Sequence, residues 1–153
     1  MHFGDLMRIF EKQITLIEVP GEVSLTLGVS GCPNNCPGCS WAKLDTEGPE
    51  MSLQQFDDIL SPLVGMVTCV TFLGGDWCSD LTDFLSVAIA KGFKTCLYTG
   101  LDTCDCKGQL DYLKTGDYRE ELGALDSEKT NQIFINVNTG ENLNHLFRKS
   151  QRK

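Results

Sequence analysis

The feature that most constrains the fold of this sequence is a nearly continuous apolar run, Val67-Thr-Cys-Val-Thr-Phe-Leu73. Such a run is typical of a strand that is buried on both faces, as the inner strands of a parallel sheet are. Parallel strands need long crossover connections, usually helices, because the chain must return before the next strand begins. The run therefore predicts a helix before it and a helix after it.

Both flanking segments have helical patterns. Ser52 and Gln55 have the spacing of a capping box at a helix start. The apolar residues that follow have helical spacing, and they are Leu53, Phe56, Ile59, Leu60 and Leu63. After the apolar run, Ser79 or Asp80 is expected to cap a second helix that ends at Gly92.

The remaining strand candidates complete an α/β pattern. Residues 23–29 alternate between apolar and polar side chains, and residues 93–98 follow the second helix. Residues 110–114 and 133–137 are weaker candidates. Strand, helix, strand, helix and strand within about 75 residues predict right-handed crossovers and a mostly parallel sheet.

Length and charge narrow the class of protein. The 153 residues are expected to form a single domain, 1–153, with a core over about 15–140 and a basic tail at 145–153. A net charge of −8 argues against nucleic acid as a partner. No apolar window is long enough for a membrane span, so we expect a cytoplasmic protein. The tail is interpreted as a solvated, frayed end or as a docking segment for an acidic partner; its basic residues are Arg148, Lys149, Arg152 and Lys153.

Three of the eight cysteines lie close together directly after residues 23–29. Cys32, Cys36 and Cys39 have the spacing C-x3-C-x2-C, and in a reducing compartment such a cluster favours metal binding or catalysis. A structural zinc site closes four positions, and here the second cysteine pair of a zinc ribbon is missing. Three thiolates can hold a 4Fe–4S cluster and leave one iron open for an exogenous ligand.

A second polar motif is expected at the same edge of the sheet. Gly74-Gly75-Asp76 follows the buried strand, as the cysteines follow residues 23–29. The carboxyl ends of parallel strands meet at one edge, and ligands bind there in α/β folds. The two motifs together predict a ligand site at this edge.

These motifs resemble those of radical S-adenosylmethionine enzymes, in which C-x3-C-x2-C follows the first strand and Gly-Gly-Glu/Asp the second. Further segments resemble the activating proteins of anaerobic (class III) ribonucleoside-triphosphate reductase. They are Pro37-Gly38-Cys39, Val19-Pro20-Gly21, Tyr98-Thr99-Gly100, residues 111–123 and residues 130–132. The resemblance covers about residues 15–137, and Ser40-Trp41 departs from the usual pattern of that group.

The resemblance implies both cofactors and their contacts. Cys32, Cys36 and Cys39 would ligate a 4Fe–4S cluster, and S-adenosylmethionine would occupy its open iron. Residues implied to contact S-adenosylmethionine are Gly38, Cys39, Ser40, Gly74, Gly75, Asp76, Thr99 and Asn131.

The implied function is that of an activating enzyme with a small, partial (βα) barrel. One electron from the cluster cleaves S-adenosylmethionine, and the resulting 5′-deoxyadenosyl radical removes hydrogen from a glycine in the reductase's large subunit. The partners would be that subunit and an electron donor such as flavodoxin or ferredoxin. Two alternatives stay open: a radical enzyme that acts on a small molecule, and a non-enzymatic cysteine metal module.

Several residues have more than one interpretation. Cys69 and Cys96 are expected in the core. Lys114 is either a solvent-exposed charge at a strand end or a cofactor contact. Cys78, Cys104, Cys106 and Trp41 are left without an assigned role, and Cys104 and Cys106 are expected to be exposed.

Overall fold

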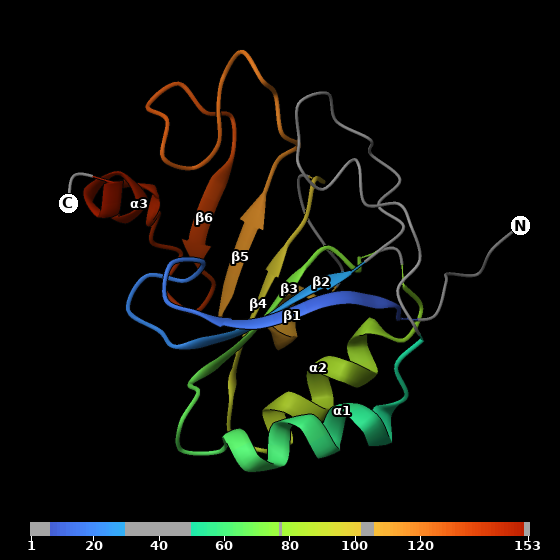
Figure 1. Cartoon of the computed structure of the whole chain (residues 1–153). Helices are drawn as coiled ribbons and strands as arrows, with labels where there is room; N and C mark the ends of the chain where they lie inside the picture. Colours follow the sequence, from blue (N-terminus) through green and yellow to red (C-terminus); the bar gives the residue numbers. More distant parts are fainter. Residues whose placement is uncertain (1–6, 30–49, 77, 102–105, 152–153) are drawn as a thin grey trace, which may run out of the picture.

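The computed structural model describes residues 7–29, 50–76, 78–101 and 106–151, without the side chains of residues 10 and 148–151. Its sheet has six strands in the order β1-β2-β3-β4-β5-β6 (Figure 1). The strands are β1 (Ile9–Thr15), β2 (Ser24–Val29), β3 (Cys69–Leu73), β4 (Lys94–Tyr98), β5 (Tyr112–Thr115) and β6 (Ile133–Asn136). The helices are α1 (Leu53–Leu60), α2 (Leu81–Ala90) and α3 (Asn144–Gln151), with short 3-10 turns at Ser61–Leu63 and Lys107–Gln109.

The predicted α/β fold is confirmed. Strands β2, β3, β4 and β5 are parallel, and β1 and β6 are antiparallel edge strands. The sheet is open, since β1 pairs on one side with β2 and β6 pairs on the other with β5. Among the residues described, no helix has the length and apolar character needed to cross a membrane.

Helix α1 forms as its sequence predicts. Ser52 Oγ accepts the Gln55 backbone N–H at 3.1 Å, and Gln55 Oε1 accepts the Ser52 N–H at 2.8 Å. Asp80, one of the two residues predicted to cap α2, stands at the cap position, but its side chain forms no cap bond. Its carboxylate instead accepts the backbone N–H of Met7 at 3.2 Å, which ties α2 to the start of β1.

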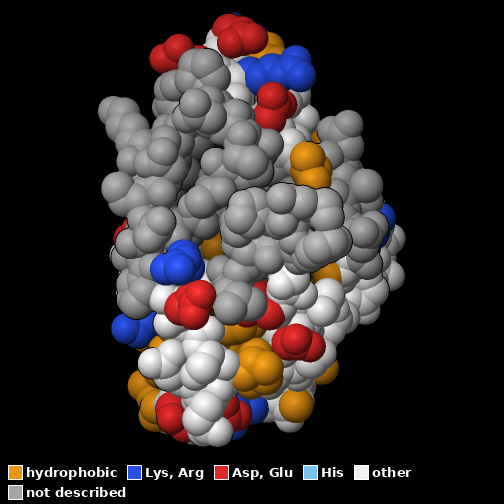
Figure 2. Space-filling view, turned by 90° about the vertical axis from the view of Figure 1, so that its right-hand side faces the viewer, with side chains coloured by type: hydrophobic (Ala, Val, Ile, Leu, Met, Phe, Trp, Pro, Cys, Tyr) orange, Lys and Arg blue, Asp and Glu red, His pale blue; other side chains and the backbone are white. Residues whose placement is uncertain are grey.

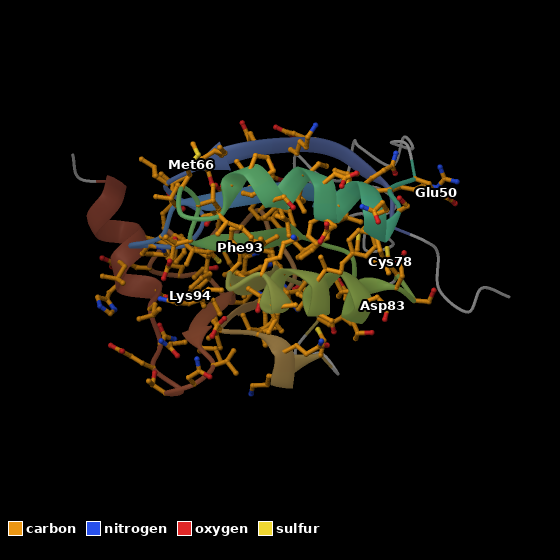
Figure 3. The ribbon with its side chains drawn as sticks, turned by 90° about the horizontal axis from the view of Figure 1, so that it is seen from below. Glu50, Met66, Cys78, Asp83, Phe93 and Lys94 are labelled. Atoms are coloured by element: carbon orange, nitrogen blue, oxygen red, sulfur yellow. The ribbon has the colours of Figure 1, made fainter. Side chains whose placement is uncertain are left out.

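The first hydrophobic core lies between the sheet and helices α1 and α2, which cover one face together (Figures 1 and 3). Phe72 of β3 meets Phe56 of α1 with ring centroids 6.0 Å apart, and Phe56 meets Phe84 of α2 at 4.9 Å. Alternate residues of β2 and β3 point to this face, which explains the apolar spacing of both strands.

The second core lies on the opposite face, and the first part of the tail packs against it. Helix α3 covers most of the residues expected to be frayed, and its Leu146 and Phe147 pack against this core. The Phe147 ring lies 5.0 Å from that of Phe134 in β6. Asn144 Oδ1 also accepts the Phe134 backbone N–H at 2.8 Å. These contacts order a segment that composition alone assigns to solvent.

A buried carboxylate joins the amino ends of the strands. Glu22 accepts hydrogen bonds from Thr68 Oγ1 (2.6 Å), Lys94 Nζ (2.9 Å) and Tyr112 OH (2.8 Å). Burial alone would raise the pKa of Glu22, but these donors outweigh it and hold the pKa below its usual value. The network fastens β3, β4 and β5 to the segment that leads into β2.

Candidate functional site

The carboxyl ends of β2, β3, β4 and β5 lie at one edge of the sheet, as predicted, because the four strands are parallel. This edge carries Gly74-Gly75-Asp76 after β3 and Thr99 after β4. Asn131 reaches the same edge from the other direction, since it precedes the antiparallel β6. The cluster loop predicted to follow β2 lies outside the described residues, as do Cys32, Cys36, Gly38, Cys39, Ser40, Trp41 and Cys104.

The Gly-Gly turn is built for close approach to the neighbouring strands. Gly74 and Gly75 have φ angles of +90° and +107°, which residues other than glycine rarely adopt. The Gly74 N–H donates to Tyr98 O at 2.9 Å, which holds the turn against β4. A β-carbon on Gly75 would lie 3.4 Å from Val29, the last residue of β2. The turn therefore lies directly beside the point where the predicted cluster loop begins.

Asp76 interacts with the Thr99 side chain, and its Oδ1 has no partner among the described residues. The Thr99 hydroxyl donates to the Asp76 carboxylate, and the same hydroxyl accepts the Leu101 N–H at 3.1 Å. Asp76 Oδ1 is buried and has no hydrogen-bond partner among the described residues. Burial raises the pKa of Asp76, while the hydrogen bonds and the charge of Lys114 oppose this rise. A carboxylate with one oxygen buried in this way is stabilised by a cation that binds beside it.

Lys114 is not a solvent-exposed charge, so that interpretation is wrong. Its exposed fraction is 7%, and its Nζ donates to the Gly116 carbonyl oxygen at 2.9 Å. The ammonium also lies 5.8 Å from the centroid of the Tyr98 ring. The charge of Lys114 acts on the pKa of Asp76, so this edge has a buried positive charge near a partly buried carboxylate.

Asn131 has one side-chain atom that is held and one without a partner in the described part of the chain. Its Nδ2 donates to the backbone oxygen of Asp117 at 3.1 Å and to Asp117 Oδ1 at 3.2 Å. Asn131 Oδ1 is buried without a hydrogen-bond partner in the described part of the chain. The neighbouring Gln132 is buried, and its Nε2 lies 3.5 Å from Gly116 O.

The described cysteines do not add reactive thiols to this edge. Cys69 and Cys96 are completely buried, which confirms their assignment to the core. Burial raises the pKa of Cys69 to about 12 and also raises that of Cys96, so both stay protonated at neutral pH. Cys106 is buried in the first core rather than exposed, and Cys78 is buried there too. Within the described ranges, no three His, Cys, Asp or Glu side chains form a metal-binding group.

One depression among the described residues is separate from this constellation. It has a volume of about 370 Å³ and is lined by Glu50, Met51, Ser52, Leu53, Gln55 and Asp80, at the start of α1. On the face shown in Figure 2, acidic and basic side chains lie close together over the described surface. The Arg8–Glu50 ion pair, at 3.6 Å, combines both signs of charge near this depression.

The sequence predicts Gly74, Gly75 and Asp76 at the edge where the parallel strands end, and the strand order agrees with this. Thr99 and Asn131, which the resemblance names, lie at the same edge. Sequence reasoning missed the parts that depend on tertiary contacts, namely the burial of Lys114 and the bond between Asp117 and Asn131. Gly116, the glycine that directly follows β5, was the available signal for the close approach of these loops.

Comparison with known proteins gives no relative: no family model, no curated protein and no solved structure matches this chain.

Proposed function

We propose that this chain is a radical S-adenosylmethionine enzyme that generates a glycyl radical on the large subunit of anaerobic ribonucleoside-triphosphate reductase. The cysteine spacing and the Pro37-Gly38-Cys39 form suggest this class. The observation that carries the proposal is Asp76 Oδ1, a buried carboxylate oxygen without a partner in the described chain, at the edge expected for the cofactor.

The described residues fit the amino-acid part of S-adenosylmethionine. Its ammonium group would donate to Asp76 Oδ1, and the Thr99 hydroxyl would help to keep this carboxylate in place. Such a bond would lower the raised pKa of Asp76, because an adjacent cation favours the charged form. The Gly74-Gly75 turn, with no side chains, leaves backbone groups accessible to the ligand.

Cys32, Cys36 and Cys39 would hold the 4Fe–4S cluster beside this turn. When bound, the cluster and S-adenosylmethionine supply one-electron chemistry that ends in removal of a hydrogen atom from the target. The protein's own part is to orient the ligand and to keep the reactive atoms close together. Asp76 and Thr99 perform this at one end of the ligand.

The open sheet suggests how a protein substrate would reach the site. We propose that the sheet is the wall of a partial barrel whose open side admits a glycine loop of the reductase. A closed (βα)8 barrel needs about 250 residues, far more than the 153 of this chain. The activity would require an electron donor such as flavodoxin or ferredoxin and would take place in the cytoplasm.

The first test is anaerobic reconstitution with iron and sulfide, followed by dithionite and S-adenosylmethionine. We expect a brown protein that forms 5′-deoxyadenosine. Cys36→Ala should lose both the cluster and the product, whereas the matched control Cys69→Ala, in the core, should keep both. An intact cluster without 5′-deoxyadenosine would refute the proposed chemistry. If the protein loaded without oxygen contains zinc in place of iron, the result would instead favour a non-enzymatic metal module.

A further inference from the structure

We propose that Asn131 accepts a hydrogen bond from the nucleoside end of the ligand and that Asp117 and Gly116 position it for this purpose. The inference rests on the proposed function and assigns the second end of the same site. It concerns the direction of one hydrogen bond, the group that supplies its donor and the residues that orient the acceptor.

The orientation of the Asn131 amide is determined by its neighbours. Its Nδ2 lies 3.1 Å from Asp117 O and 3.2 Å from Asp117 Oδ1, and both of these atoms only accept hydrogen bonds. The opposite orientation would place the amide oxygen against two oxygens. Asn131 Oδ1 must therefore be the atom that faces away from Asp117, and it is buried without a partner in the described chain.

Asp117 is itself held in place from the solvent side. Arg119 Nε donates to Asp117 Oδ1 at 3.2 Å, and both side chains are partly exposed, at 55% and 40%. An exposed ion pair of this kind contributes little stability. Its consequence here is orientation, because the oxygen that bonds Arg119 is the one that bonds Asn131.

Gly116 allows the loops to come this close. Its φ is +98°, and a β-carbon there would lie 3.2 Å from Asn131 O and 3.2 Å from Gln132 Cα. A side chain would therefore push the segment before β6 away from the end of β5. The backbone at Gly116 thus sets the position of Asn131, as Asp117 sets its orientation.

The place of Asn131 in the sheet indicates which end of the ligand it meets. Asp76 follows β3 and Asn131 precedes β6, three strands away along the same edge (Figure 1). At about 4.8 Å per strand this separation is about 14 Å. A ligand whose ammonium bonds Asp76 would have to extend along the edge, so its nucleoside would be the part that reaches Asn131.

The chemistry of the acceptor limits the donor. Since Nδ2 is committed to Asp117, Asn131 cannot form the paired hydrogen bonds that an amide makes with an adenine edge. A single acceptor remains, and the donors at the nucleoside end are the exocyclic amine of adenine and the ribose hydroxyls. All of these are uncharged, so the bond would add affinity and orientation without a change of charge.

The experiment measures binding of S-adenosylmethionine to the full-length reconstituted protein by anaerobic calorimetry. The variants are Asn131→Ala, which removes the acceptor, and Asp117→Ala, which removes one of its two supports. Asn138→Ala is the matched control, because Asn138 Nδ2 donates to Asp111 Oδ1 at 3.1 Å near the other edge of the sheet. Two analogues complete the set: one whose adenine lacks the exocyclic amine and one whose ribose lacks both hydroxyls.

We expect Asn131→Ala to weaken binding about tenfold and Asp117→Ala about threefold, because a bond to a buried acceptor is lost or misaligned. Asn138→Ala should bind as the wild type does. The loss caused by Asn131→Ala should disappear with the analogue that lacks the bonded donor, which identifies that donor.

Three results would overturn the inference. One is unchanged binding by Asn131→Ala, and another is equal losses for Asn131→Ala and Asn138→Ala. The third is an unchanged effect of Asn131→Ala with both analogues. In all three the wild type still binds S-adenosylmethionine, so the proposed function would survive. A wild type that fails to bind S-adenosylmethionine would remove the proposed function and this inference together.

Discussion

Replacement of Glu22 by Gln tests whether one buried carboxylate holds the amino ends of the strands together. Gln keeps the shape of Glu, but its amide nitrogen must face at least one of the donors, Thr68, Lys94 or Tyr112. Hydrogen bonds to a charged group contribute about 1.5–3 kcal/mol each and do not add. The Lys94 side chain is 55% exposed, so its share is small. We expect Glu22→Gln to lower the free energy of unfolding by about 2–4 kcal/mol.

The pH dependence of this difference follows from the lowered pKa of Glu22. A carboxyl whose pKa is lower in the folded state stabilises the fold above its unfolded pKa, about 4.3. That contribution is lost as the pH falls through the folded pKa. The gap between wild type and Glu22→Gln should therefore be full at pH 7 and should shrink below about pH 4.

Urea unfolding at several pH values, followed by circular dichroism, measures both effects. Glu50→Gln is the control, since the Glu50 side chain is exposed and forms an ion pair with Arg8 at 3.6 Å. This replacement should change the free energy of unfolding by less than about 0.5 kcal/mol. Equal midpoints for Glu22→Gln and the wild type at pH 7 would refute the reasoning. A gap of constant size between pH 3 and pH 7 would refute the electrostatic part of it.

Three further predictions concern the site and the second core. Asp76→Asn should stabilise the ligand-free protein above about pH 4, because a carboxyl with a raised pKa loses stability as the pH rises and Asn does not ionise. The same replacement should abolish the stabilisation of the protein by S-adenosylmethionine. Thermal melts with and without S-adenosylmethionine measure both effects. A ligand-free variant that melts at a lower temperature than the ligand-free wild type at pH 7 would contradict the predicted stabilisation. Gly75→Ala should lower the free energy of unfolding by at least about 1 kcal/mol, because the φ of Gly75 is +107°. Gly108→Ala should not lower it, because the space around Gly108 is open. Equal urea midpoints for the two variants would disprove this prediction. Phe134→Ala should lower the free energy of unfolding, measured in urea, by about 3–5 kcal/mol, since Phe134 is fully buried in the second core. A loss below about 1 kcal/mol would show that α3 is not held by this core.

The predictable elements are those whose signals are local. Helix α1 follows from a capping box and an apolar stripe within one segment, and both are present in the structure. Strand β3 follows from its apolar run, and α2 is closed by Gly92 at φ +94°. The meeting of Gly74, Asp76 and Thr99 at one edge follows from topology, because parallel strands end on the same side.

The elements that could not be predicted depend on distant partners. Strand β1 has the sequence Ile-Phe-Glu-Lys-Gln-Ile-Thr, with no alternation, and is defined by its pairing with β2 around a register shift. Helix α3 is mostly polar, and it is held by Leu146 and Phe147 against a core built from other strands. The burial of Lys114 likewise involves Tyr98, which lies on the neighbouring strand β4 and which no local pattern connects to Lys114.

The most direct measurement of the central claim is electron paramagnetic resonance of the reconstituted protein with its cognate reductase large subunit. Both are incubated without oxygen, with dithionite and S-adenosylmethionine. We predict a glycyl radical doublet on the reductase subunit that is absent with Cys36→Ala and strongly reduced with Asp76→Asn. Formation of 5′-deoxyadenosine without the doublet would contradict the account and favour a radical enzyme that acts on a small molecule.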